Sequence, residues 1–377
     1  MKLESTIGYK VITGWLNKLD RKPFLFQKQT WQQIIDGQSG LVNAPTGFGK
    51  TYSVFLGAII DFINQHPENY QIKSDNGLQL VWVTPLRALA KDIGRAMEEV
   101  ITDLGMKWRV AIRNGDTETA ERQRQNRKMP EVLIITPESL HLLLAQKGYP
   151  SIFRSLKILA VDEWHELLGT KRGVQVELAI SRIIGIKTVS LWGISATIGN
   201  LKQAAEVLLS PLNISDPVII STDLKKKIRI ESIFPDEIET YPWAGHLGLK
   251  LADKVMPVIN NHTTSLIFIN TRGMSERWYQ TLLNADPDLA GAIALHHGSI
   301  EHQLRIWVEE ALHAEKLKAV VCTSSLDLGV DFRPVETVVQ VGSPKGVARF
   351  LQRAGRSGHQ PGSVSQIYFL PTHSLEL

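Results

Sequence analysis

The most informative segment of this 377-residue chain is an octapeptide that reads Ala44-Pro45-Thr46-Gly47-Phe48-Gly49-Lys50-Thr51. Gly47 and Gly49 permit positive φ angles, so successive backbone N–H groups can converge on a phosphate. Lys50 adds a positive charge, and Thr51 adds a hydroxyl group for Mg²⁺. A short apolar run precedes the octapeptide and a helix-compatible one follows it. The pattern predicts a strand, a phosphate-binding loop and a helix whose N-terminus favours anions.

The octapeptide departs from the usual pattern at its first position, where Ala44 stands in place of glycine. On this segment alone, a glycine-rich turn with a solvated lysine remains an alternative. The rest of the chain therefore has to supply the other parts of a nucleotide site.

Length and composition set the frame for that search. A chain of 377 residues is long enough for two or three domains of roughly 150 residues each. Lysine and arginine total 42 against 38 aspartate and glutamate, which permits a polyanionic partner without requiring one. The single cysteine excludes an intramolecular disulfide and a cysteine-cluster metal site. With no secretory start and no long apolar run, we expect a cytoplasmic protein without a membrane span.

Short β-branched runs alternate with longer helical patterns along the whole chain. Such runs are typical of strands that are buried on both faces, and their alternation favours parallel sheets built from right-handed βαβ units. The sequence therefore predicts an α/β fold. The expected strands are residues 78–83, 132–135, 157–161, 188–192, 265–269, 319–321 and 335–341.

The rhythm breaks between residues 209 and 250, where several prolines follow one another. We place the hinge at 238–246, because residues 218–233 retain a strand-like pattern. This predicts an N-terminal helix in residues 1–21, a first domain in 22–237 and a second in 238–377.

A second informative segment reads Asp162-Glu163-Trp164-His165 and directly follows an apolar run. Ligands of parallel sheets bind at the carboxyl ends of strands, so these acids are expected beside the phosphate loop. Asp162 and Thr51 are the predicted Mg²⁺ ligands, and Glu163 is predicted to orient or deprotonate the attacking water. For His165 two roles stay open: a relay to the second domain, or a local hydrogen bond.

Phosphoryl transfer leaves charge on the γ-phosphate oxygens, which an arginine can stabilise. Arg353 and Arg356 are candidates, and they lie in the segment Gln352-Arg-Ala-Gly-Arg-Ser-Gly-His359, where Gln352 is grouped with them as a catalytic residue. This segment belongs to the second half of the chain. ATP is therefore expected to bind between the two domains.

In this order, the motifs resemble those of superfamily 2 DExH-box helicases. The segments that carry the resemblance are Phe26-Gln27, the octapeptide, Thr84-Pro-Leu-Arg-Ala-Leu-Ala90, Thr136-Pro-Glu-Ser-Leu140, Asp162-Glu-Trp-His165, Ser195-Ala-Thr197, the stretch 323–331 and the stretch 352–359.

Longer segments are similar to the ligase-associated, DNA-damage-response members of the large helicase-related (Lhr) group, namely Arg113-Asn-Gly-Asp-Thr117, the stretch 162–177, His296-His-Gly-Ser299 and Gly342-Ser-Pro-Lys-Gly-Val-Ala-Arg349. The resemblance implies two tandem RecA-like domains, whose parallel sheets are flanked by helices. It also implies use of ATP and Mg²⁺, 3′ to 5′ movement on single-stranded DNA, a role in DNA repair with a ligase or nuclease as partner, and a monomer.

The resemblance assigns further residues. Gln27 matches the glutamine that reads adenine. Ser195 and Thr197 match an element that links hydrolysis to strand movement, and Gly329 and Asp331 match a motif that meets the ribose and the nucleic acid. An ordinary surface, turn or capping role is the alternative for each of them.

Nucleic-acid contacts are expected where threonine follows a strand and precedes a helix, because a helix start offers free N–H groups to phosphates. A track of this kind follows the backbone and reads no sequence. For any single candidate residue, a role in capping the helix alone is the alternative. The candidates are Thr84, Arg87, Thr136, Thr271, Arg272 and Thr323.

These features predict an ATP-dependent DNA translocase that hydrolyses ATP as its two domains close and open. Members of the resembled family normally continue into further C-terminal domains, so we expect this chain to unwind duplexes poorly. An RNA helicase or remodeller remains an alternative, because backbone tracking separates RNA from DNA only through the 2′-hydroxyl. A nucleic-acid-binding module without turnover is a second alternative.

Overall fold

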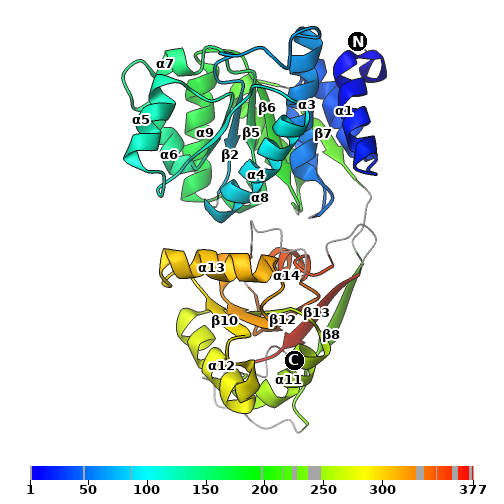
Figure 1. The fold of residues 1–377 in the computed structure, drawn as a ribbon, viewed down its shortest axis with the longest axis vertical. Helices are drawn as coiled ribbons and strands as arrows, with labels where there is room; N and C mark the ends of the chain where they lie inside the picture. The colour runs from blue at the N-terminus through cyan, green and yellow to red at the C-terminus, as the bar shows by residue number, and fades with distance from the viewer. Residues whose placement is uncertain are drawn as a thin grey trace. The chain divides into compact units, whose positions relative to one another are not determined.

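The computed structural model describes residues 2–45, 47–85, 87–196, 198–214, 216–222, 227–236, 248–327, 335–344, 346–358, 364–372 and 376. The chain forms two compact units, residues 1–224 and 225–377, each built around its own sheet (Figure 1). No helix in these described ranges is long and apolar enough to cross a membrane.

The sheet of the first unit has seven strands in the order β3-β4-β2-β5-β6-β1-β7. Every pairing in it is parallel, which confirms the predicted fold class. The strands are β1 (Gly40–Asn43), β2 (Leu80–Val83), β3 (Val110–Arg113), β4 (Val132–Ile135), β5 (Ile158–Val161), β6 (Ser190–Ser195) and β7 (Val218–Ser221).

Helices cover both faces of this sheet, because successive side chains of a strand point to opposite sides. Val42 of β1 packs into a core with α1 to α4, whereas Leu41 packs into a second core with α6 to α10. The helices are α1 (Ile7–Lys18), α2 (Leu25–Ile35), α3 (Lys50–Gln65), α4 (Arg87–Asp103), α5 (Thr119–Arg127), α6 (Pro137–Leu144), α7 (Tyr149–Ile152), α8 (Trp164–Leu167), α9 (Lys171–Ile184) and α10 (Leu201–Leu209).

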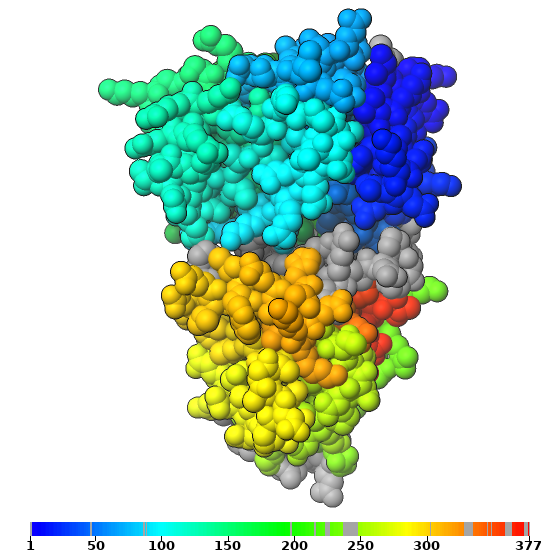
Figure 2. All heavy atoms as spheres, viewed as in Figure 1, coloured from blue at the N-terminus to red at the C-terminus, as the bar shows by residue number. Residues whose placement is uncertain are grey.

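Helix α1, dark blue in Figure 2, lies on the outside of the first unit and packs against α3. Gly8 is the close-contact point: a Cβ atom there would lie 2.4 Å from the carbonyl oxygen of Ile60. The Gly8 N–H also donates to Oδ1 of Asn64 at 2.8 Å, and the indole N–H of Trp15 donates to Asp103 at 2.9 Å. The N-terminal segment is thus anchored by backbone contact and by hydrogen bonds.

The sheet of the second unit has six strands in the order β10-β11-β9-β12-β13-β8, again with every pairing parallel. Helices α11 and α12 contribute to the core on one face, and α13 and α14 lie on the other side (Figure 1). The elements are β8 (Ile228–Ser232), α11 (Ala252–Asn261), β9 (Ser265–Phe268), α12 (Arg272–Ala285), β10 (Ile293–His296), α13 (His302–His313), β11 (Ala319–Cys322), the 3₁₀ turn η5 (Ser324–Leu326), β12 (Thr337–Val341), α14 (Val347–Ala354) and β13 (Ser365–Leu370).

The compact units divide at residues 224 and 225, earlier than the predicted boundary at 237 and 238. The reason is β8, which pairs with β13 along Ile228–Ser232 and so belongs to the second sheet. Its backbone groups find their partners in a strand more than 130 positions further along the chain, which no local pattern signals. The predicted hinge at 238–246 lies outside the described residues.

Candidate nucleotide and nucleic-acid site

The glycine-rich loop joins β1 to α3 in the predicted strand–loop–helix arrangement. Gly47 has a φ of 87° and Gly49, the residue before α3, a φ of 72°, so both take the conformation that glycine allows. The N–H of Ala44 donates to the carbonyl oxygen of Ser195 on β6 at 3.1 Å. The start of the loop is thereby fixed to the centre of the sheet. Thr46 lies outside the described residues.

Gln27 fastens this loop to α2. Its Oε1 accepts the Phe24 N–H at 2.9 Å, and its Nε2 donates to the carbonyl oxygen of Gly49 at 3.0 Å. The ring of Phe48 meets that of Phe24 edge-on, with centroids 5.7 Å apart. The predicted adenine-reading residue therefore lies directly beside the loop, and in the described part of the chain one N–H and one lone pair of its amide have no partner.

Lys50, Asp162 and Glu163 converge at the carboxyl edge of the sheet. Nζ of Lys50 lies 3.9 Å from Oε2 of Glu163, and both side chains are buried. Oδ1 of Asp162 accepts the Glu163 N–H at 2.9 Å, while its Oδ2 accepts the indole N–H of Trp82 at 3.3 Å. Burial, and then the Glu163 carboxylate, raise the pKa of Asp162 to about 7 against the opposing charge of Lys50.

This cluster fits a magnesium–nucleotide complex. Among the described residues, Nζ of Lys50 and Oε2 of Glu163 have no hydrogen-bond partner although both atoms are buried. Buried polar atoms without partners are costly, and a phosphate oxygen and a water molecule would satisfy these two. Thr51 lies in the first turn of α3, so it and Asp162 are the residues that would hold Mg²⁺.

Two features of the cluster escaped the sequence analysis. Trp82 stands in an apolar run that is typical of a core strand, and only the pairing of β2 with β5 brings its N–H to Asp162. Glu163 has a φ of 46°, an unusual value for a residue other than glycine. The left-handed backbone turns the chain sharply from β5 into α8.

His165 joins the cluster to β6. Its Nδ1 lies 2.9 Å from Oγ of Ser195 and 3.5 Å from Oε2 of Glu163. Burial lowers the pKa of His165, and the Glu163 carboxylate offsets this only in part, so the imidazole is neutral at pH 7. Trp164 is a core residue, because it is fully buried and its N–H donates to Ala204 at 2.9 Å. Thr197 lies outside the described residues.

The nucleic-acid candidates of the first unit lie at the carboxyl edge of its sheet. Thr136 precedes α6 with Pro137 at its first position, as predicted. Thr84 directly follows β2 and is buried, and α4 runs from Arg87 to Asp103. Arg87 pairs with Asp116 at 2.5 Å, and its side chain is 59% exposed.

The candidates of the second unit occupy the same edge of the other sheet. Thr271 is the residue before α12, and Arg272 donates to Ser299. Thr323 directly follows β11, and its N–H donates to the carbonyl oxygen of His296 at 3.2 Å. Gly329 and Asp331 lie outside the described residues.

Of the three predicted catalytic residues near the C-terminus, Gln352 and Arg353 lie in α14 and Arg356 follows it, and all three are buried. Arg353 is engaged within its own unit: Nε donates to Asp327 at 2.6 Å, and Nη1 to Gln340 at 2.7 Å.

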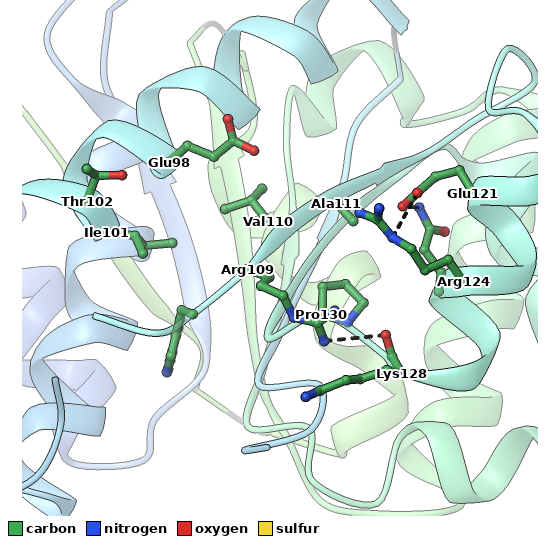
Figure 3. A pocket seen from close by; sticks show the side chains of 12 residues that line it. Glu98, Ile101, Thr102, Arg109, Val110, Ala111, Glu121, Arg124, Lys128 and Pro130 are labelled. Atoms are coloured by element: carbon green, nitrogen blue, oxygen red, sulfur yellow. Dashed lines mark hydrogen bonds and ion pairs between the residues drawn. The ribbon is translucent and has the colours of Figure 1, made fainter. Parts of the chain in front are cut away.

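A pocket of about 340 Å³ lies elsewhere on the first unit, between α4, β3 and α5 (Figure 3). Arg109 donates to the Lys128 carbonyl oxygen on one side of it, and Arg124 pairs with Glu121 on the other. None of its lining residues belongs to the nucleotide cluster, so it is a separate feature.

Comparison with known proteins places these sites in a class. Residues 24–204 match the model of the DEAD/DEAH box helicase family, and residues 249–360 match that of the helicase conserved C-terminal domain. The two matches fall in the first and the second unit. Together with the nucleotide cluster, they define a superfamily 2 helicase motor of two RecA-like domains.

More specifically, the chain is Lhr-like: over most of its length it is similar to helicases of the Lhr group, as the sequence resemblance implied. It is 35% identical over 92% of its length to the ATP-dependent helicase Lhr-Core of Methanocaldococcus jannaschii, and 36% identical over 89% to Lhr-Core protein 2 of Thermococcus barophilus. It spans 41% and 40% of the lengths of these relatives.

A solved structure of the Mycobacterium smegmatis helicase Lhr, bound to single-stranded DNA and AMP-PNP, has the same fold. The match covers 99% of this chain and 48% of that one, with a TM-score of 0.83 and 30% identity.

Proposed function

We propose that this chain is a nucleic-acid-stimulated ATPase that moves 3′ to 5′ along single-stranded DNA and acts in DNA repair. The observation that carries the ATPase is the buried Nζ of Lys50. It lies 3.9 Å from Glu163 and lacks a hydrogen-bond partner among the described residues, directly after a loop whose glycines have positive φ. A buried cation in this position calls for an anionic ligand.

The residues of the first unit divide the work of hydrolysis. Lys50 and the loop amides bind the phosphates, while Gln27 holds the loop and reads the adenine. Glu163 orients the attacking water and accepts its proton. Thr51 and Asp162 are the residues that would hold Mg²⁺, which would neutralise charge on the phosphate oxygens. Trp82 and the Glu163 N–H fix the orientation of the Asp162 carboxylate.

The second unit supplies the arginine that completes the charge stabilisation, and we assign this role to Arg356. An arginine recruited in this way is worth about 10³ to 10⁵ in rate. His165 and Ser195, 2.9 Å apart, connect the water-orienting acid to β6 and so to Thr197. Through this contact, hydrolysis is coupled to movement on the strand.

Single-stranded DNA is the proposed track. Helix starts and side chains at the carboxyl edges of both sheets offer N–H groups and positive charge to phosphates without reading bases. The relative from M. smegmatis was solved with single-stranded DNA, which supports DNA over RNA. The contact residues are Thr84, Arg87 and Thr136 in the first unit, and Thr271, Arg272 and Thr323 in the second.

Strand type and polarity have separate tests. ATPase rates with DNA and RNA of the same sequence and length should show stronger stimulation by DNA; equal or stronger stimulation by RNA would establish the remodeller alternative. Displacement of streptavidin from a biotinylated oligonucleotide then gives the direction. The proposal expects faster release from the 5′ end than from the 3′ end, and the reverse would contradict it. Glu163→Gln is the inactive control in both experiments.

A further inference from the structure

The turn at residues 323–327 in the second unit is fastened at its first end to β10. The Thr323 N–H donates to the carbonyl oxygen of His296 at 3.2 Å. Oγ of Ser325 donates to the same carbonyl at 2.9 Å and lies 2.8 Å from Nδ1 of His296. On its other side, Nε2 of the imidazole lies 3.3 Å from Glu309 on α13. His296, the last residue of β10, therefore holds the turn through both its backbone and its side chain.

The other end of the turn is held by Arg353 on α14. Nε of Arg353 donates to Oδ1 of Asp327 at 2.6 Å, and its Nη2 donates to Oδ2 at 3.2 Å. The two side chains are only 2% and 5% exposed. A two-pronged pair of this kind fixes orientation as well as distance. Breaking it would leave a buried charge without compensation.

Two further contacts immobilise the Arg353 guanidinium. Its Nη1 donates to Oε1 of Gln340 on β12 at 2.7 Å, and its carbon lies 4.8 Å from the centre of the Phe268 ring on β9. The Gln340 amide is in turn held by the carbonyl oxygens of Val341 and Gly342. The guanidinium is thus fixed to two strands and to the turn at once, within one unit.

We infer that Arg353 is a positioning residue that sets the turn 323–327 between β10 and α14, and not a group that touches the γ-phosphate. The inference rests on the proposed function in one respect, namely that Thr323 at the start of the turn contacts the nucleic acid. Arg356 follows only three positions after Arg353. We call the paired Arg353 and Asp327 side chains the clamp. The clamp therefore links the turn 323–327, which is proposed to contact the DNA, to the end of α14, which precedes the proposed catalytic Arg356.

Arg353→Lys is the first test, because lysine keeps the charge and loses the planar fork. We expect the affinity for a single-stranded oligonucleotide to fall by about tenfold, as the loss of one charge-assisted hydrogen bond allows. Stimulation of ATP hydrolysis should fall with it. The unstimulated kcat and the KM for ATP should stay within about twofold of wild type. A γ-phosphate role predicts instead that the unstimulated kcat falls by about 10³ or more, and that result would overturn the inference.

Asp327→Asn is the second test, since an amide cannot accept both prongs of the guanidinium. It should reproduce the phenotype of Arg353→Lys, and the double variant should be no worse than the poorer single one. Arg349→Lys is the matched control: its Nε lies 3.4 Å from the same carboxylate but its side chain is partly exposed, so it should behave like wild type. The clamp would be contradicted if the effects of Arg353→Lys and Asp327→Asn added up in the double variant. It would also be contradicted if Asp327→Asn behaved like wild type.

Hydrogen exchange separates this inference from the proposed function. In Arg353→Lys and Asp327→Asn, amides of residues 323–327 should exchange faster than in wild type, while those of β9 and β11 keep their protection. Unchanged exchange in the turn would refute the clamp. A wild-type protein with no strand-stimulated ATPase would instead refute the proposed function, and the exchange result would still decide the clamp.

Discussion

At the scale of single residues, the nucleotide cluster separates binding from chemistry. In the proposed function, Lys50 supplies the positive charge that binds the phosphates, and Glu163 is the base that takes a proton from the water. Glu163→Gln keeps the size of the side chain but removes its ability to take a proton. We expect ATP affinity within about twofold of wild type and a kcat lower by about 10² to 10⁴.

The measurement is equilibrium binding of a fluorescent ATP analogue beside steady-state hydrolysis. Lys50→Ala serves as the opposite control, because it should lose affinity for the nucleotide itself. Hydrolysis by Glu163→Gln at the wild-type rate would show that another group activates the water.

Trp82 gives a second residue-scale prediction. Trp82→Phe keeps an aromatic ring in β2 but removes the N–H that holds Oδ2 of Asp162. The loss of one such hydrogen bond is worth about 1 kcal/mol, or roughly fivefold in affinity. We expect a loss of this size in the affinity for ADP with Mg²⁺, and no change when EDTA removes the metal ion.

Trp192→Phe is the matched control for Trp82→Phe. Trp192 is a buried tryptophan of β6, and its N–H bonds to Ser190. The same chemical change there should leave the affinity for ADP unaltered, both with Mg²⁺ and with EDTA. If Trp82→Phe weakens ADP binding equally with and without Mg²⁺, the tryptophan supports the fold and does not position Asp162.

The sequence analysis found the residues whose chemistry is visible in their own type. Few sites other than nucleotide sites use this order of residues: glycines in a loop, then a lysine, and later paired acids after an apolar run. Trp82 was missed because a tryptophan in an apolar run is normally core. The contacts of Arg353 were missed for another reason: Asp327, Gln340 and Phe268 are brought to it only by the pairing of strands far apart in the sequence.

At the scale of elements, α1 tests how the first unit is assembled. The two glycines of this helix differ in their surroundings: a Cβ at Gly8 would lie 2.4 Å from the Ile60 carbonyl oxygen, whereas Gly14 has nothing within 4 Å. Gly8→Ala should therefore lower the free energy of unfolding by about 1–3 kcal/mol. Gly14→Ala should raise it by about 0.5–1 kcal/mol, because alanine favours a helix.

Denaturant unfolding of both variants measures whether the free energy of unfolding falls in Gly8→Ala and rises in Gly14→Ala. The comparison removes the common effect of a glycine-to-alanine change in one helix. Equal shifts in the two variants would mean that α1 does not pack against α3 as closely as the structure shows.

Element boundaries were predicted less well than element types. The apolar runs correctly indicated strands such as β4 and β12, because a buried parallel strand is apolar along its whole length. The edge strand β3 was missed, since its side chains are only partly buried, and β8 was indicated only as part of the strand-like stretch 218–233. The prolines after residue 232 indicate a local break in secondary structure. The unit to which β8 belongs is decided instead by its pairing with β13.

At the scale of the whole molecule, the proposed function requires the two parallel-sheet units of this Lhr-like chain to act together as an ATPase. In the proposed function, the first unit supplies the nucleotide loop and the acids, and the second supplies Arg356 and the turn 323–327. Because both units are proposed to contact single-stranded DNA, ATP turnover should respond to that DNA.

The rate of ATP hydrolysis with and without single-stranded DNA tests this claim most directly. We expect a low rate without DNA, severalfold stimulation by a saturating single strand, and no hydrolysis by Lys50→Ala in either condition. A wild-type rate that is the same with and without the strand, or hydrolysis that survives Lys50→Ala, would contradict it.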